Sequence, residues 1–272
     1  MPWTSSHIKW LVDTGETLTT ADGKTVEVWE FRHGNEDAVL SAWAKHFRNH
    51  YCLDSEIDEL RDGTGLGRTQ YLINFAFPDK SKAPGPSIRA GDFAEILVAD
   101  FLEFILKFWV PRFRYDEKSI RNESEKGVDI LGFKLVGQEG SPEDTLAAFE
   151  AKGRLTGGQR DNRLQGAVND SVKDFYVRKA ESLNALKRRL IKACNRLDAL
   201  KVQRFQNQAD RPYSEESGAA AVLSTSVFNP TVLSETNTTG HPNKNALKLL
   251  VIRGDELMVL VHELYKRAAD EA

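Results

Sequence analysis

Three charged side chains in the middle of the chain have the types and spacing that metal-dependent hydrolysis requires. Glu150 and Lys152 stand two residues apart at the end of an apolar run that includes Phe149. Because side chains alternate between the two faces of a strand, Glu150 and Lys152 point the same way. Asp129 lies in an earlier apolar segment, beyond a polar connection over residues 137–144 that is typical of a hairpin turn. An Asp on one strand and Glu-x-Lys on its neighbour can converge on one divalent cation.

Hydrolysis of a phosphodiester needs positive charge at the scissile phosphate and a water that is nucleophilic at neutral pH, and a divalent cation supplies both. Mg²⁺ takes one or two protein carboxylates, so Asp129 and Glu150 are the minimal pair of ligands, with Mn²⁺ a plausible substitute. Lys152 can orient or deprotonate the attacking water, or stabilise the developing charge. Glu95 is the candidate for a further acid at the metal, and Asp92 is its alternative. An exposed ion pair worth about 0–1 kcal/mol is the alternative interpretation of Glu150 and Lys152.

The hydrophobic pattern predicts the elements that must position these residues. Apolar residues form one broad face of a central helix that carries Glu95. Two strands joined by the polar turn carry Asp129 and Glu150, and further strands and a closing helix follow. The strands are expected at about 127–136, 145–152, 219–228 and 247–252, and the helices at 87–110 and 255–269. This order predicts an α/β fold with a mixed central sheet flanked by helices.

The remaining segments are expected to pack on this core. Residues 1–86 are predicted to form an N-terminal region, with a hairpin over 7–33 that can extend the edge of the sheet. The pattern then predicts a helix over 35–50 and a strand over 69–77. The polar segment 229–245 is expected to be a disordered loop. Residues 87–272 are predicted to form the core itself, including a long helical insert.

The helical insert over residues 161–210 carries an apolar seam and a basic surface. The seam has strict 3-4 spacing, as in a helical pair or short coiled coil: Leu183, Leu186, Leu190, Ala193, Leu197 and Leu200. Between Arg178 and Arg204 there are nine Lys or Arg residues against two acids. This surplus suits a nucleic-acid backbone, although a solvated helix face is the equal alternative. The candidate DNA contacts are Lys187, Arg188, Arg189 and Lys192.

Composition restricts the class of protein. The formal net charge is -3, so binding to nucleic acid must depend on a local patch. The two cysteines, Cys52 and Cys194, are far apart in the sequence, which disfavours a disulfide framework or a zinc site. No signal peptide is predicted, and charged residues interrupt the longest apolar stretch, so no membrane span is expected. The cytoplasm is the expected location.

A helix with Glu95, a Gly-Val-Asp strand ending at Asp129 and a Glu-Ala-Lys-Gly-Arg strand over 150–154 together resemble the PD-(D/E)XK nuclease superfamily. The resemblance implies a restriction-endonuclease-like core with Glu95, Asp129, Glu150 and Lys152 in the active site. It adds Arg154 and Gln165 as candidate DNA contacts. The first motif has Gly-Val before the aspartate where the superfamily pattern has proline.

Five segments in order are similar to the HamA family, the nuclease-like subunit of the bacterial Hachiman anti-phage system. They are Gly-Asp-Phe-Ala-Glu (91–95), Gly-Val-Asp-Ile (127–130), Glu-Ala-Lys-Gly-Arg (150–154), Ala-Val-Asn-Asp-Ser-Val-Lys-Asp (167–174) and Leu-Leu-Val-Ile-Arg-Gly (249–254). The resemblance implies a DNA substrate, a HamB-like helicase partner and a nuclease restrained until foreign or damaged DNA is sensed. A catalytically silent subunit that binds DNA or regulates a helicase, and a stand-alone restriction-type endonuclease, remain alternatives.

Overall fold

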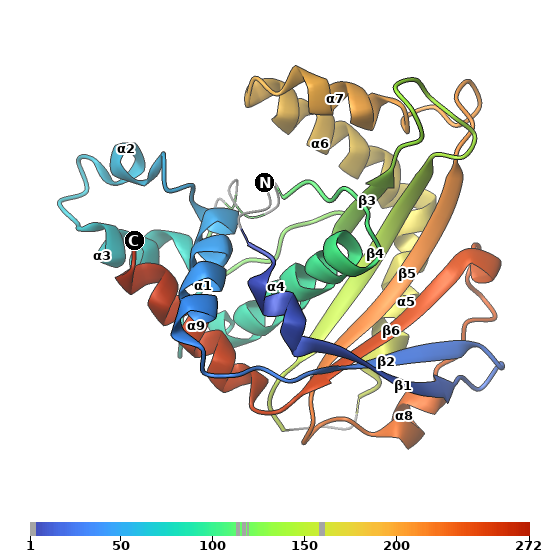
Figure 1. Cartoon of the computed structure of the whole chain (residues 1–272), viewed down its shortest axis with the longest axis horizontal. Helices are drawn as coiled ribbons and strands as arrows, with labels where there is room; N and C mark the ends of the chain where they lie inside the picture. The colour runs from blue at the N-terminus through green and yellow to red at the C-terminus, as the bar shows by residue number, and fades with distance from the viewer. Residues whose placement is uncertain (1–3, 113–114, 116–117, 119, 158–160) are drawn as a thin grey trace.

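The protein is built on one six-stranded mixed sheet, described here from a computed structural model (Figure 1). The structure describes residues 4–112, 115, 118, 120–157 and 161–272. The strands lie in the order β1-β2-β6-β5-β4-β3. The central strands β2, β6, β5 and β4 run parallel, whereas β1 and β3 pair antiparallel at the two edges. Their bounds are β1 Leu11–Thr19, β2 Thr25–Phe31, β3 Ile130–Lys134, β4 Thr145–Arg154, β5 Ser214–Ser224 and β6 Leu247–Gly254.

Helices cover both faces of this sheet, which confirms the predicted α/β class. Figure 1 shows α4 (Gly85–Asp100) in front of the sheet and α5 (Arg163–Lys173) behind it. Helices α1 (Asp37–Tyr51) and α9 (Leu257–Asp270) share a hydrophobic core with α4. The other helices are α2 Ile57–Arg61, α3 Arg68–Tyr71, α6 Lys179–Lys192, α7 Arg196–Gln203 and α8 Pro230–Ser234. Short 3-10 turns are η1 Ser6–Trp10 and η5 Lys244–Ala246, and π-helical turns are η2 Leu72–Ala76, η3 Phe101–Ile105 and η4 Asp174–Arg178.

Strand β4 separates two cores because its side chains alternate. Phe149 and Ala151 are buried in the core on the side of α4, whereas Ala148 is buried in a core with α6 and α7. Helix α4 lies very close to this strand at Gly153. A Cβ atom there would stand 2.4 Å from the carbonyl oxygen of Ala90. A glycine is therefore required for the approach that brings α4 to the end of β4.

Three expectations from the sequence are wrong. Residues 69–77 are not a strand but α3 followed by the π-helical turn η2. The segment 229–245 is ordered: it contains α8, and Thr238 donates a hydrogen bond from Oγ1 to Asp22 Oδ2 over 2.7 Å. The helical insert contains α5, α6 and α7, and it turns at Cys194, which has a φ of 56° between α6 and α7. The apolar seam ends there too: its members up to Leu190 are buried, but Leu197 is 77% exposed.

A buried polar cluster ties the N-terminal segment to α4. Asp100 is fully buried, and its carboxylate accepts hydrogen bonds from Arg112 over 2.8 Å and pairs with His7 Nε2 over 2.9 Å. His46 Nε2 lies 3.3 Å from the same carboxylate and 3.2 Å from His50 Nε2. The sequence contains six histidines. Three of them belong to this cluster, two at i, i+4 spacing on α1.

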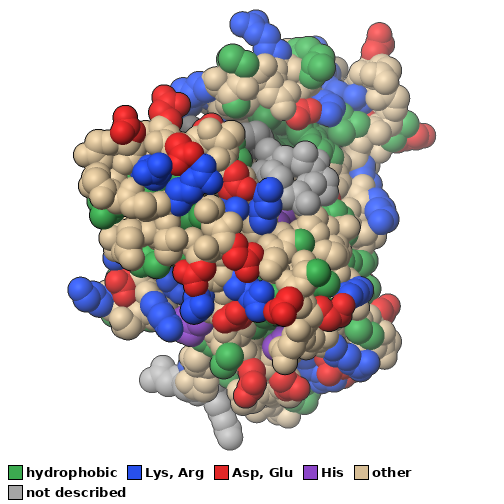
Figure 2. Space-filling view, turned by 60° about the vertical axis from the view of Figure 1, so that its left-hand side comes forward, with side chains coloured by type: hydrophobic (Ala, Val, Ile, Leu, Met, Phe, Trp, Pro, Cys, Tyr) green, Lys and Arg blue, Asp and Glu red, His purple; other side chains and the backbone are tan. Residues whose placement is uncertain are grey.

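The surface carries charges of both signs. Figure 2 shows Lys and Arg side chains interspersed with Asp and Glu over the face that lies on the left of Figure 1. Such a mixed surface does not provide a field of one sign for nucleic acid, in line with the net charge of -3. Within the described part of the chain, none of the helices has the length and apolar character that crossing a membrane requires.

Candidate active site

The β3–β4 hairpin brings Asp129 beside Glu150, as the motif spacing predicts. Ile130 pairs with Phe149 in the antiparallel register, so Asp129, one residue before β3, lies opposite Glu150. The backbone confirms the proximity, since Ala151 donates its N–H to Asp129 Oδ2 over 3.1 Å. Asp129 is only half-buried, and it therefore stands at the boundary between the core and a pocket.

Glu150 is the most perturbed acid of the group. It is 1% exposed, and Lys152 Nζ lies 3.2 Å from its Oε2. Burial raises the pKa of Glu150 to about 10, and the nearby carboxyl groups of Asp129 and Asp174 add to the rise. Lys152 opposes this shift but does not cancel it. A carboxyl group in this state is protonated at neutral pH unless further positive charge arrives.

Three charged residues that the sequence analysis did not select complete the site from the helix behind β4. Asp170 on α5, then Asp174 and Arg178 on η4, are spaced four residues apart, so they project from one side of the helix. Asp174 is 1% exposed and contacts Glu150. Arg178 lies 3.4 Å from Asp174 Oδ1 and 3.9 Å from Glu150 Oε1. The signal in the sequence was this i, i+4, i+8 charged stripe after the lysine strand.

Lys152 is held by acids on two elements. Its Nζ forms an ion pair of 2.8 Å with Asp170, besides the contact with Glu150. Burial would lower the pKa of the Lys152 ammonium, but Glu150, Asp170 and Asp129 together outweigh burial and raise it. Lys152 is therefore a cation at neutral pH. A cation there can stabilise negative charge on a phosphate or hold a water, but it is a poor base.

Neighbouring acids also respond to burial. For Asp174, burial and the charge of Asp129 outweigh the hydrogen bond with Glu150 and the contacts with Arg178, and together they raise the pKa to about 6. For Asp170, burial would raise the pKa, but hydrogen bonds from Lys152 and Lys173 lower it. Asp170 is thus an ionised partner of Lys152, whereas Asp174 titrates near neutrality.

Glu95 reaches the same region from the opposite side of β4. It is half-buried on α4 and accepts a hydrogen bond of 2.6 Å from the Tyr115 hydroxyl. A small cavity of about 40 Å³ is lined by both Glu95 and Asp129, and a cleft of about 560 Å³ is lined by both Glu95 and Lys152. Asp92, the alternative acid, is buried and receives hydrogen bonds from Tyr51 and from Lys118 inside the core. Glu95 is therefore the helix acid that faces the pockets.

The predicted DNA contacts lie on three elements: α6, the end of β4 and α5. Arg189 lines a pocket of about 90 Å³ together with Asp129, so α6 does reach the site. Arg188 and Lys192 are exposed on α6, and Lys187 donates to Gln206. Arg154 lies at the end of β4.

Arg154 and Gln165, the remaining two candidate DNA contacts, point to different parts of the structure. Arg154 lines the cleft with Lys152 and forms an ion pair with Asp161. Gln165 instead bridges α5 to the loop after α8: its side chain accepts from Asn237 N over 2.7 Å and donates to Asn169 over 2.8 Å. The structure therefore brings Arg154, but not Gln165, to the cleft.

The donor set fits a divalent cation on chemical grounds. Glu150 Oε1 and Asp174 Oδ2 are buried and have no hydrogen-bond partner among the described residues. Buried carboxyl oxygens without partners are costly unless a proton or a cation compensates them. Asp129 and Glu150 are the residues that could hold Mg²⁺, which needs only one or two carboxylates. Across the described ranges, no group of three or more His, Cys, Asp or Glu residues has the arrangement of a ready-made metal site.

Comparison with known proteins gives one finding. A family model described as HamA matches residues 6–268, nearly the whole chain. No curated protein sequence matches the chain. The family match confirms the resemblance inferred from the five motif segments, and it extends that resemblance to the N-terminal region.

Proposed function

The chain belongs to the HamA family and is thus a Hachiman defence subunit, and from this premise we propose that it is a metal-dependent deoxyribonuclease. In this proposal it is the effector of an anti-phage complex with a HamB-like helicase, and it cleaves phosphodiester bonds in DNA with Mg²⁺. The active-site residues are Asp129, Glu150 and Lys152, with Glu95 as a further acid.

The observation that carries the proposal is the state of Glu150. The Glu150 carboxyl group is buried beside two more acids and keeps a raised pKa of about 10, so the nearby Lys152 and Arg178 do not compensate its burial. A structural ion pair with Lys152 alone would lower that pKa below its ordinary value rather than leave it raised. Burial of several neighbouring carboxyl groups destabilises the fold, and such clusters with perturbed pKa values are expected at catalytic sites.

Each residue then has a definite task. Asp129 and Glu150 hold the cation, which when bound neutralises the scissile phosphate and lowers the pKa of a water. Lys152, kept protonated by its acidic neighbours, donates hydrogen bonds to the phosphate as negative charge develops. Asp170 orients the Lys152 ammonium, and Arg178 and Asp174 hold the Glu150 carboxyl from behind. Glu95 faces the cleft, where it can hold a water or a second ion.

The proposal is tested by incubating plasmid DNA and Mg²⁺ with the wild-type chain, alone and with its helicase partner and ATP. Glu150→Gln and Lys152→Met keep the side-chain volumes and remove the charges, so both are expected to abolish degradation. Lys266→Met removes a charge of the same kind from an exposed position on α9, away from the candidate DNA contacts, and is the matched control. Equal degradation by wild type and the Glu150→Gln variant would exclude a nuclease centred on Glu150.

A catalytically silent subunit that binds DNA or regulates the helicase is the second candidate. It is favoured by the ion pair of 2.8 Å between Lys152 and Asp170, which engages the ammonium in the absence of DNA. The same pair fits a nuclease that is restrained until the complex is activated. The plasmid assay separates the two, because only the restrained nuclease gains activity when helicase and ATP are added.

A further inference from the structure

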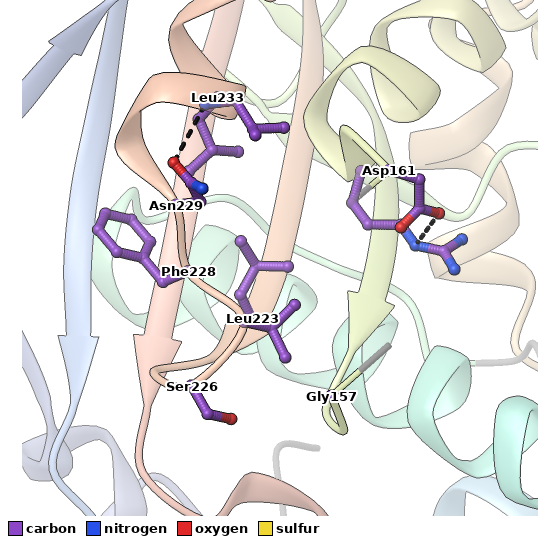
Figure 3. A pocket seen from close by; sticks show the side chains of 10 residues that line it. Gly157, Asp161, Leu223, Ser226, Phe228, Asn229 and Leu233 are labelled. Atoms are coloured by element: carbon purple, nitrogen blue, oxygen red, sulfur yellow. Dashed lines mark hydrogen bonds and ion pairs between the residues drawn. The ribbon is translucent and has the colours of Figure 1, made fainter. Parts of the chain in front are cut away.

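A second pocket lies on the face of the sheet that carries Glu150 and Lys152, beyond the end of β4. It has a volume of about 260 Å³ and is lined by the end of β5, the turn and start of α8, and the start of α5. Figure 3 shows Leu223, Phe228 and Leu233 on one side of this pocket and Asp161 on the other, with Gly157 and Ser226 at one end. We call it the α8 pocket.

The strand register puts the α8 pocket next to the active site. Arg154 pairs with Leu223, and Leu223 pairs with Arg253, so these three side chains form one row across β4, β5 and β6. Arg154 is two residues after Lys152 and therefore lies on the same face, about 7 Å further along the strand. The row of Arg154, Leu223 and Arg253 therefore lies next to Lys152 on the same face of the sheet.

The α8 pocket and the cleft that contains Lys152 are adjacent. Both are lined by Gly157 and by Arg163, the first residue of α5. For a chain-like molecule lying at Lys152, the α8 pocket is therefore a neighbouring site along the face of the sheet that carries Lys152 and Arg154. At roughly 260 Å³ the pocket is slightly smaller than the roughly 300–1,000 Å³ usual for independent small-molecule sites. Its size suits one unit of a polymer.

The lining has the two halves that a nucleotide requires. Arg163 Nε lies 3.0 Å from Asp161 Oδ2, and Arg154 pairs with the same carboxylate, so one acid orients two guanidinium groups at the rim. Guanidinium groups recognise phosphate through several donors at once. The opposite wall is largely apolar and includes the Phe228 ring, which packs against the core between the sheet and α5 and has the Arg253 guanidinium 4.7 Å from its centroid. Aromatic and apolar walls receive bases without reading their sequence.

We propose that the α8 pocket holds a nucleotide of the DNA strand that is being cut, adjacent to the scissile phosphate. Its phosphate lies against Arg154 and Arg163, and its base lies against the wall formed by Leu223 and Phe228. This inference rests on the proposed nuclease function. It assigns the strand path to the ends of the parallel strands, beyond the basic surface of α6 that the sequence favoured.

The test measures binding, not cleavage, so that the two proposals can fail separately. A fluorescent single-stranded oligonucleotide of about 12 nucleotides is titrated with the chain in EDTA, and anisotropy gives the dissociation constant. Ser226→Trp puts a bulky side chain into the pocket at an exposed position, and Thr225→Trp puts the same side chain at the exposed neighbour that does not line it. We expect Ser226→Trp to weaken binding about tenfold and Thr225→Trp to change it less than twofold.

Salt dependence tests the phosphate contact. Arg163→Ala is expected to weaken binding and to lower the slope of log affinity against log salt by about 0.7, the value for one phosphate contact on a single strand. A variant that is only destabilised would bind less but keep its slope. Lys187 on α6 does not line the α8 pocket. Ser226→Trp is therefore expected to weaken binding by the same factor in a chain that also carries Lys187→Ala.

Two results would overturn the inference. The first is an unchanged affinity of the Ser226→Trp variant, or no binding of DNA by the wild-type chain. The second is tight binding of free deoxythymidine monophosphate, blocked by Ser226→Trp, with no effect of that variant on the oligonucleotide, which would mark an effector site instead. If Ser226→Trp weakens binding but the wild type never cleaves DNA, the α8 pocket stands and the nuclease proposal fails.

Discussion

The carboxyl groups of Glu150 on β4 and Asp174 on η4 face each other in the buried space between sheet and helix. Each residue is 1% exposed, and each has one oxygen without a hydrogen-bond partner in the described part of the chain. A proton on Glu150 satisfies the pair, because the protonated acid then donates to Asp174. Without that proton, a cation in addition to Lys152 and Arg178 is needed to satisfy the pair. This relationship makes the site sensitive both to pH and to divalent metal.

The stability of the metal-free protein should fall as the pH rises. The pKa of Glu150 is about 10 in the folded chain against an ordinary value of 4.5, so between these values the folded state binds more protons than the unfolded state. The contribution of Glu150 to the free energy of unfolding therefore decreases with pH throughout that window, whereas the lowered pKa values of the buried His7 and His50 act in the opposite direction only below about pH 6.5. Thermal unfolding in EDTA between pH 5 and pH 9 measures the slope.

Glu150→Gln is the variant that isolates this effect. The amide is neutral at every pH, so the melting temperature of this variant should depend less on pH than that of the wild type. Lys192→Met should retain the wild-type slope. A wild-type melting temperature that rises between pH 6 and pH 9 would contradict the shifted pKa.

Mg²⁺ should stabilise the wild-type protein, and more so at higher pH, because cation and proton compete for the Glu150 carboxyl. A ligand that binds only the folded state at 100 times its dissociation constant adds about 2.7 kcal/mol. Thermal shift or calorimetric titration with MgCl₂ measures the gain. Asp129→Asn and Glu150→Gln should lose it. An equal shift in wild type and both variants would place the cation elsewhere.

Much of the site could be predicted because its residues lie on two neighbouring strands. Two apolar runs separated by a polar turn located β3 and β4, and the hairpin register then placed Asp129 opposite Glu150. Asp174 was missed although the helix after β4 was expected. A helical acid normally faces water, and only the packing of η4 on β4 decides that this one is buried. Single-sequence patterns do not contain that packing.

The errors elsewhere have the same cause. The pattern over residues 69–77 predicts a strand, but the segment pairs with none of the six strands and satisfies its backbone groups locally in α3 and η2. Polar composition predicts disorder over 229–245. The segment is ordered by contacts far away in the sequence, among them Thr238 and Lys244 with Asp22.

The packing of α4 on β4 gives a matched pair of glycine variants. Gly153→Ala would place a methyl group against the Ala90 carbonyl and the Ala94 side chain, so the helix must move and stability should fall by about 1–3 kcal/mol. Gly91→Ala adds the same methyl group on α4 where nothing lies within 4 Å. It should stabilise the helix by about 0.5–1 kcal/mol. Urea unfolding measures both. Similar losses in the two variants would contradict the close approach at Gly153.

The buried cluster around Asp100 should be the most sensitive point of the N-terminal region. Asp100 is fully buried, and its pKa lies well below the ordinary value because Arg112 and the histidines outweigh its burial. Asp100→Ala would leave the Arg112 guanidinium, whose side chain is 3% exposed, with Glu103 as its remaining described acid. Removing one partner of a buried pair costs about 3–5 kcal/mol, since the other charge remains desolvated.

Denaturation by urea at pH 7 measures that cost, and Asp58→Ala is the matched control. Asp58 also pairs with two arginines, Arg61 and Arg68, but its side chain is 52% exposed, so water replaces the lost contacts. The Asp58 variant should unfold near the wild-type midpoint, whereas the Asp100 variant should unfold at a much lower urea concentration. Because His7 contacts Asp100, the same variant should also expose the N-terminal segment to limited proteolysis. Wild-type stability and protease resistance after Asp100→Ala would mean that this cluster does not anchor the segment.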